Sequence, residues 1–124
     1  VILRGGGGRT NYDSPSVHYD SRIMQQSGQN ERLMVDMSHA NSNKQHQNQL
    51  NVCADLCSQL ASGEDKIMGV MIESNLVAGS QSIGNGTNLV YGQSVTDACI
   101  AWEDTVGALN DLAAAIRERR GSQE

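Results

Sequence analysis

Hydrophobic residues occur along this chain in short continuous runs, separated by segments with helical periodicity. Two of the runs cover residues 32–37 and 66–72, and a third occupies residues 1–3. Apolar runs without alternating polar positions are typical of strands that are covered on both faces. We therefore predict buried strands over these three ranges.

Three further segments carry helical signals. Residues 15–26 begin with Pro15 behind Ser14, a candidate helix cap, and both residue types are common at helix starts. Residues 44–61 and 102–119 repeat apolar positions at steps of three and four, which places these positions on one helix face. The Gln and Asn residues between Leu50, Cys53, Cys57 and Leu60 of the first of these two helices are expected to face water. The predicted apolar stripe of the last helix consists of Val106, Leu109, Leu112, Ala113 and Ile116.

The segment between residues 74 and 96 is rich in Gly, Ser and Asn. A connection of this length in a compact domain usually has a functional role, and residues 89–92 within it are predicted to form a short extended piece. Strands and helices otherwise alternate, which indicates an α/β fold with parallel strands joined by crossovers. We expect one domain over residues 1–124, either an open sheet or a slice of an eight-fold barrel.

The composition narrows the classes of function. The net charge of -5 argues against nucleic acid or an anionic membrane as a partner, because both select basic surfaces. No apolar run approaches the ~20 residues of a membrane helix. The three cysteines have no framework-like spacing, and free thiols fit a reducing, cytoplasmic compartment. Because the chain begins at Val1, inside a predicted strand, we interpret it as part of a larger protein.

Polar side chains follow the predicted strands and the long connection. Arg4, His39 and Glu73 stand just after strands, and Asp97 ends the connection. Because ligands bind beyond the carboxyl ends of parallel strands, these ends are the expected place of a site. An imidazole and two carboxylates suit Mn, Fe, Co or Zn, so His39, Glu73 and Asp97 are candidate metal ligands. The alternative is that each of them caps a helix or hydrogen-bonds a loop.

Arg4 and Asp36 each allow two interpretations. The forked donors of Arg4 fit a phosphate or a carboxylate, although a surface arginine paired with an aspartate has the same sequence pattern. Asp36 lies within a predicted strand, where a buried carboxylate needs a partner. It either orients a metal ligand or pairs with an arginine or lysine.

Four segments, in order along the chain, resemble signatures of the class I synthases of 3-deoxy-D-arabino-heptulosonate 7-phosphate (DAHP). They are residues 2–6 (ILRGG), 35–42 (VDMSHANS), 69–74 (GVMIES) and 91–99 (YGQSVTDAC). The similarity extends over nearly the whole chain. Thr10 replaces a proline and Asn75 replaces a histidine of the usual family pattern, and we expect the second change to tune function without abolishing it.

The resemblance implies that residues 1–124 are the C-terminal portion of a single (β/α)8 TIM-barrel catalytic domain, namely its last three strand–helix units. The family condenses phosphoenolpyruvate with erythrose 4-phosphate to DAHP and phosphate, the first step of the shikimate pathway to aromatic amino acids. By resemblance, His39, Glu73 and Asp97 are three of four metal ligands, and the fourth is an upstream cysteine. Arg4, His39 and Asp97 take part in catalysis, and Arg4 and Asp97 contact substrates.

The resemblance also implies a homo-oligomeric parent enzyme. Three strand–helix units cannot close a barrel, so the chain alone is expected to be inactive. Two other readings remain open at this point. One is a non-catalytic barrel scaffold or folding fragment, and the other is a different aldol-type synthase that uses phosphoenolpyruvate.

Overall fold

A parallel sheet forms the centre of the computed structural model, which describes residues 1–121. Its strands lie in the order β1 (Ile2–Leu3), β2 (Leu33–Asp36) and β3 (Ile67–Met71). Both pairings are parallel, and the register of the second shifts between Leu33 and Met34. The predicted strands and their parallel arrangement are thus confirmed.

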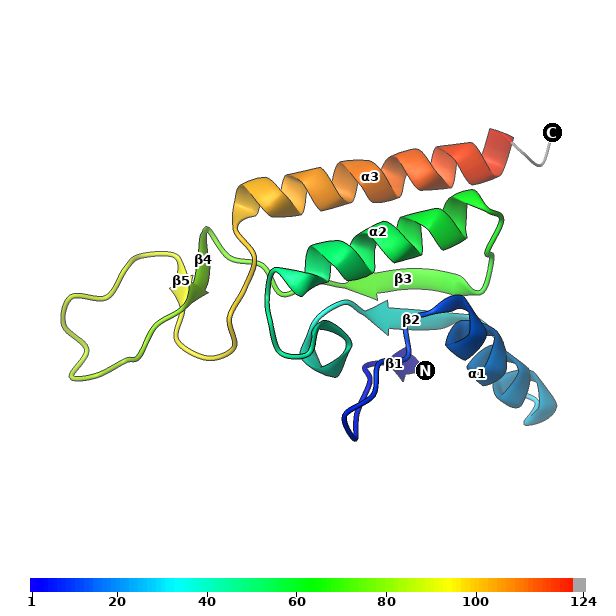
Figure 1. The fold of residues 1–124 in the computed structure, drawn as a ribbon, viewed down its shortest axis with the longest axis horizontal. Coiled ribbons are helices and arrows are strands. Elements are labelled where there is room, and N and C mark those ends of the chain that lie inside the picture. The colour runs from blue at the N-terminus through cyan, green and yellow to red at the C-terminus, as the bar shows by residue number, and fades with distance from the viewer. Residues whose placement is uncertain (122–124) are drawn as a thin grey trace.

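Helices α1 (Ser14–Gln26), α2 (Asn48–Ala61) and α3 (Trp102–Gly121) complete the body of the molecule. In Figure 1, α2 lies along the sheet and α3 runs beside α2, on the side away from β1. The predicted helix near Pro15 is confirmed, but its cap is Asp13 and not Ser14, because the Asp13 side chain accepts the backbone N–H of Ser16. No helix within residues 1–121 is long and apolar enough to cross a membrane.

The core lies between the helices and one face of the sheet. Leu33 and Val35 of β2 are fully buried and belong to the same cluster as Val17 of α1 and Leu56 of α2. The prediction that the strands are covered on both faces holds for β2, whose residues are buried or half-buried on both sides, but it is wrong for β3. Met68 of β3 is 68% exposed, because no described element packs against it.

The segment before α2 differs from the predicted helix over residues 44–61. A short 3-10 helix, η1 (His39–Ser42), is followed by Asn43 and Lys44, which have positive φ angles of 53° and 58°. Residues other than glycine rarely adopt this left-handed backbone conformation. A residue in this conformation cannot continue a right-handed helix. The regular helix therefore begins only at Asn48.

The predicted apolar stripe of α3 is shifted around the helix axis. The buried residues are Thr105, Ala108, Leu112 and Ala115, so Leu112 is the predicted residue that is fully confirmed. Val106 and Leu109 are 39% and 48% exposed. The helix carries two apolar stripes, and the one with small side chains packs against α2, because alanines allow close approach of two helices.

The long connection contains a second, two-stranded parallel sheet of β4 (Val77–Ser80) and β5 (Gln93–Ser94). Together with the loop between them, these strands form an arm that extends away from the helices in Figure 1. Residues 89–92 are not a strand, contrary to the prediction. The extended backbone lies on either side of them, at β4 and β5.

Candidate metal centre

The carboxyl ends of β2 and β3 bring two of the predicted ligands together. Asp36 pairs with Met71 at the end of the parallel register. His39 stands three residues beyond Asp36, and Glu73 stands two residues beyond Met71. Because both strands end at one edge, the side chains that follow them share the same rim.

Asp97 reaches this rim from the connection between the arm and α3. Just after it, the backbone N–H of Ile100 donates to the carbonyl of Glu73 at 3.0 Å, and Asn75 N–H donates back to Ile100 at 3.0 Å. Gly79 and Cys99 exchange two more backbone hydrogen bonds of 2.8 and 3.1 Å. These bonds fasten the segment that carries Asp97 against the end of β3 and against β4.

The three side chains converge. Each offers one ligand atom, and these atoms all lie within 4.8 Å of one another. Nε2 of His39 lies 3.6 Å from Oε1 of Glu73 and 3.9 Å from Oδ2 of Asp97. An imidazole nitrogen facing two carboxylates is a donor set that a divalent cation such as Mn, Fe, Co or Zn satisfies. The arrangement therefore fits the predicted metal.

Asp36 stands directly behind this group. It is 1% exposed, and its Oδ2 lies 2.7 Å from Nδ1 of His39. Its other oxygen, Oδ1, accepts the backbone N–H of Ser38 at 2.8 Å. Of the two interpretations that the sequence left open, the structure supports orientation of a candidate ligand, since the side-chain partner found for Asp36 within residues 1–121 is His39 and no lysine or arginine.

Two residues of the rim were not singled out from the sequence. Ser38 donates its hydroxyl to Oε2 of Glu73 at 2.6 Å. Gln49 of α2 is fully buried, although it is polar and stands just before the apolar positions that begin at Leu50. A signal was present, because Gln49 lies three, seven and eleven residues before Val52, Leu56 and Leu60, which are buried on the same face.

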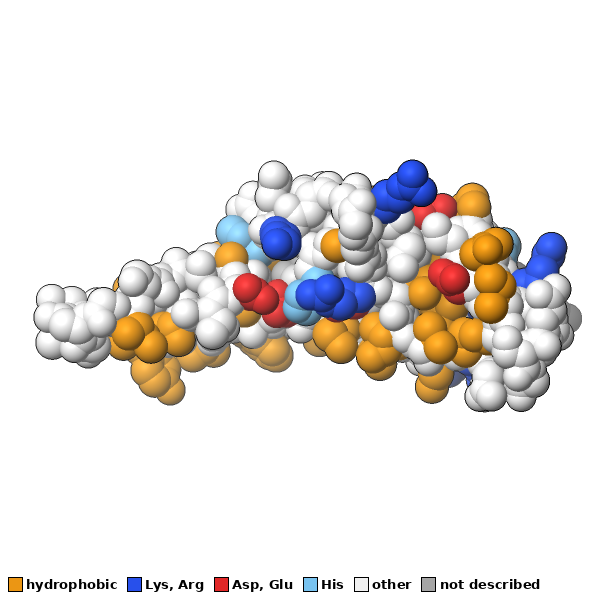
Figure 2. Space-filling view, turned by 90° about the horizontal axis from the view of Figure 1, so that it is seen from below, with side chains coloured by type: hydrophobic (Ala, Val, Ile, Leu, Met, Phe, Trp, Pro, Cys, Tyr) orange, Lys and Arg blue, Asp and Glu red, His pale blue; other side chains and the backbone are white. Residues whose placement is uncertain are grey.

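Arg4 lies at the edge of the same rim. A cavity of about 650 Å³ is lined by Arg4, the glycine turn after it, His39, Lys44, Glu73 and Asp97, among others. Arg4 is exposed, and no ion pair of Arg4 with an acid is found within residues 1–121. The face drawn in Figure 2 shows acidic, histidine and basic side chains gathered next to one another.

Asn41 joins the backbone around Arg4 to the end of β2. Its side-chain amide donates to the carbonyls of Leu3 and Asp36 at 3.1 and 2.9 Å, and its Oδ1 accepts the N–H of Asn11. Gly5 fits here because it has a φ of +71°, and a Cβ at this position would lie 2.9 Å from Oδ1 of Asn41. The start of the glycine turn is thus fixed against β2.

Comparison with known proteins places this chain in a family. The model of the DAHP synthetase I family matches residues 1–110. The chain belongs to the DAHP synthetase I family. The resemblance seen in the four sequence segments is therefore confirmed.

Relatives within the DAHP synthetase I family are similar over almost all of this chain. It is 50% identical over 121 residues to a Phe-sensitive phospho-2-dehydro-3-deoxyheptonate aldolase of Escherichia coli K12, covering 98% of this chain and 34% of the relative. It is 45% identical over 129 residues to the phospho-2-dehydro-3-deoxyheptonate aldolase of Corynebacterium glutamicum, with the same coverage of 98% and 34%.

A solved structure of the same family confirms the fold. The phospho-2-dehydro-3-deoxyheptonate aldolase of Francisella tularensis SCHU S4 superposes with a TM-score of 0.91 at 45% identity, over 96% of this chain and 34% of that chain. The chain thus spans about a third of the length of the relatives that it matches.

The cysteines of this chain lie outside the group of ligand atoms found within residues 1–121. All three are free thiols. Burial, followed by the neighbouring Cys57, raises the pKa of the Cys53 thiol to about 12. A thiol with such a pKa is protonated at neutral pH and is a poor metal ligand, so Cys53 serves packing between α2 and α3.

Proposed function

We propose that the protein carrying this chain is a metal-dependent DAHP synthase, which condenses phosphoenolpyruvate with erythrose 4-phosphate. The observation that carries the proposal is the convergence of His39, Glu73 and Asp97 within 4.8 Å at one rim. It occurs in a chain of the DAHP synthetase I family, whose relatives are named as aldolases of this product. In this proposal, residues 1–124 form the C-terminal portion of the catalytic domain, as the last three units of a (β/α)8 barrel.

His39 Nε2, Glu73 and Asp97 would hold the divalent cation. When bound there, Mn, Fe, Co or Zn supplies Lewis acidity toward the aldehyde oxygen of erythrose 4-phosphate, on which negative charge develops during the condensation. The carboxylates of Glu73 and Asp97 offset the charge of the ion. The imidazole of His39 adds a directional ligand whose position is fixed by its hydrogen bond to Asp36.

Arg4 and Asp97 would contact the substrates. The exposed guanidinium of Arg4 at the cavity edge can donate two parallel hydrogen bonds to a phosphate. Held in this way, phosphoenolpyruvate presents its C3 carbon to the aldehyde, and orientation alone can lower the barrier by several kcal/mol, on the order of 7–11 in well-aligned cases. The side chain of Asp97 is 72% exposed, which leaves it open to the hydroxyls of the sugar phosphate.

The test is an assay of the complete polypeptide that carries this chain. Purified protein is stripped with a chelator, reloaded with Mn, Fe, Co or Zn, and supplied with both substrates. We expect DAHP and phosphate in equal amounts from the reloaded protein and neither from the stripped protein. Folded, metal-loaded protein that releases no phosphate with any of the four ions would contradict the proposal.

A further inference from the structure

The carboxylate of Asp36 has no direct role in the site proposed above. It is 1% exposed, so it does not reach a substrate in the cavity, and its position behind His39 keeps it out of the group of converging ligand atoms. A buried carboxylate is costly unless its oxygens accept hydrogen bonds. The two hydrogen bonds that Asp36 accepts therefore indicate its role.

The first bond determines the form of the imidazole. Asp36 Oδ2 lies 2.7 Å from Nδ1 of His39, and an ionised carboxylate can only accept. With Asp36 ionised, the ring carries its proton on Nδ1. In a neutral imidazole, this leaves the lone pair on Nε2, the nitrogen that faces Glu73 and Asp97 at 3.6 and 3.9 Å.

The second bond extends to another candidate ligand. Oδ1 of Asp36 accepts the backbone N–H of Ser38 at 2.8 Å, and this fixes the residue whose hydroxyl donates to Oε2 of Glu73 at 2.6 Å. Ser38 is itself buried. Glu73 thus keeps Oε1 toward His39 while its other oxygen is occupied by the hydroxyl.

We propose that Asp36 is a positioning residue that prepares two of the three metal ligands at once: it selects the imidazole form of His39 with a free Nε2, and through Ser38 it holds the carboxylate of Glu73. This inference rests on the proposed metal site. It adds that the site is arranged by one buried side chain before the ion arrives.

The substitution Asp36→Asn separates this role from packing, because the two side chains have nearly the same shape. Its single oxygen can keep the N–H of Ser38, but its NH2 group then donates toward Nδ1 of His39. The ring must accept there and move its proton to Nε2, which can no longer bind a cation. If the amide flips instead, its NH2 group opposes the N–H of Ser38 and that bond is lost.

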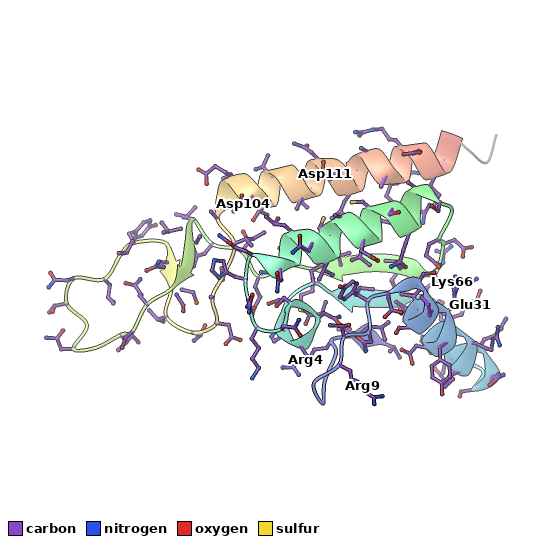
Figure 3. The ribbon with its side chains drawn as sticks, in the orientation of Figure 1. Arg4, Arg9, Glu31, Lys66, Asp104 and Asp111 are labelled. Atoms are coloured by element: carbon purple, nitrogen blue, oxygen red, sulfur yellow. The ribbon has the colours of Figure 1, made fainter. Side chains whose placement is uncertain are left out.

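The experiment uses the complete polypeptide and Mn²⁺ alone as the probe. Mn²⁺ affinity is measured by the electron paramagnetic resonance of the free ion. The imidazole form is measured by ¹⁵N NMR of histidine-labelled, metal-free protein, with the His39 signals assigned by their loss in His39→Ala. Asp111→Asn is the matched control, because it removes the same charge from an exposed position on α3 (Figure 3).

We expect Asp36→Asn to weaken Mn²⁺ binding by about 10–100-fold, as substitutions behind a metal ligand typically do, and to move the His39 proton from Nδ1 to Nε2. Ser38→Ala should weaken binding less and leave the proton on Nδ1. Asp111→Asn should change neither quantity.

Unchanged Mn²⁺ affinity in folded Asp36→Asn, or a proton that stays on Nδ1, would overturn the inference. If the variant does not fold, the unsubstituted metal-free protein decides, because a His39 proton on Nε2 there also refutes it. Failure of the proposed function looks different: the protein then binds Mn²⁺ and shows the Nδ1 proton, but forms no DAHP.

Discussion

Gln49 and Glu73 exchange two hydrogen bonds between the side chain of one and the backbone of the other. The N–H of Glu73 donates to Oε1 of Gln49 at 2.9 Å, and Nε2 of Gln49 donates to the carbonyl of Glu73 at 3.0 Å. The same carbonyl also accepts the N–H of Ile100. A side chain of α2 therefore completes the hydrogen bonding of the backbone just beyond β3, where the sheet ladder has ended.

The first prediction concerns this pair. Gln49→Leu leaves the N–H of Glu73 without its acceptor, while the carbonyl keeps the bond from Ile100, and an unsatisfied buried group costs about 1–3 kcal/mol. We expect a loss of stability in this range, measured by urea unfolding of the complete polypeptide, together with weaker Mn²⁺ binding. Gln47→Leu is the control, because Gln47 is exposed and its side chain caps nothing. Equal stabilities of the two variants would contradict the role assigned to Gln49.

The second prediction concerns the candidate ligand His39. His39→Ala removes the imidazole from the group of converging atoms and should lower the bound metal, measured by elemental analysis, and abolish DAHP formation. His18→Ala is the control, since His18 pairs with Glu64 away from the rim. Metal content and rate that survive the loss of His39 would show that it is not a ligand.

The third prediction concerns Arg4. A hydrogen bond to a charged group contributes about 1.5–3 kcal/mol, so Arg4→Ala should raise the KM for phosphoenolpyruvate by about 10–150-fold. The KM for erythrose 4-phosphate should change less. Arg9, at the other end of the same glycine turn (Figure 3), is also exposed and provides the control. If Arg9→Ala has the same effect as Arg4→Ala, the two act only through the overall charge.

The fourth prediction concerns pH and Cys53. Desolvation by burial, followed by Cys57, raises the pKa of this thiol from 9.0 to about 12. Between these values the unfolded chain loses a proton that the folded chain keeps, so stability is complete below pH 9 and falls as the pH rises toward 12. The slope contributed by one such group is at most about 1.4 kcal/mol per pH unit.

The measurement compares urea unfolding of the unsubstituted protein and Cys53→Ala at pH 7, 9 and 10. The value at pH 7 gives the packing cost of the substitution. We expect the stability of Cys53→Ala to fall less steeply above pH 9. Parallel pH profiles of the two proteins would show that the thiol keeps its ordinary pKa in the fold.

Most of the fold could be predicted from the sequence, because its strands are apolar runs and its helices repeat at three and four residues. The start of α2 could not. Lys44 has a left-handed backbone (φ 58°), and nothing in its side chain indicates this conformation. It follows from the turn after η1, in which the N–H of Lys44 donates to the carbonyl of His39.

The orientation of α3 was also beyond the sequence. Both of its stripes are apolar, and only the packing against α2 selects the stripe with Ala108 and Leu112 over the one with Val106 and Leu109. The pairing of β4 with β5 could not be predicted either, because it also depends on tertiary contacts. Each strand is short, and their pairing depends on side chains such as Gln81, which donates to the carbonyls of Val90 and Gln93.

The candidate ligands His39, Glu73 and Asp97 could be picked from the sequence, but the hydrogen bonds that hold them in place could not. Strand ends and residue types pointed to His39 and Glu73, because parallel strands bring their carboxyl ends together. The sequence left open whether Asp36 serves a ligand or an ion pair. The three-dimensional structure answers this question, because Oδ2 of Asp36 lies 2.7 Å from Nδ1 of His39.

The arm has a consequence for the lifetime of the protein. Asp97 is carried by the segment between β5 and α3, which is fastened by backbone hydrogen bonds of Cys99 and Ile100, and its side chain is 72% exposed. An ion shared with His39 and Glu73 would hold this segment at the rim, because a ligand that binds only one arrangement of the chain stabilises that arrangement. If the proposed function holds, loss of the metal would then do more than stop turnover: the segment that carries Asp97 would open more often, and proteases would cut it faster than in the metal-loaded protein.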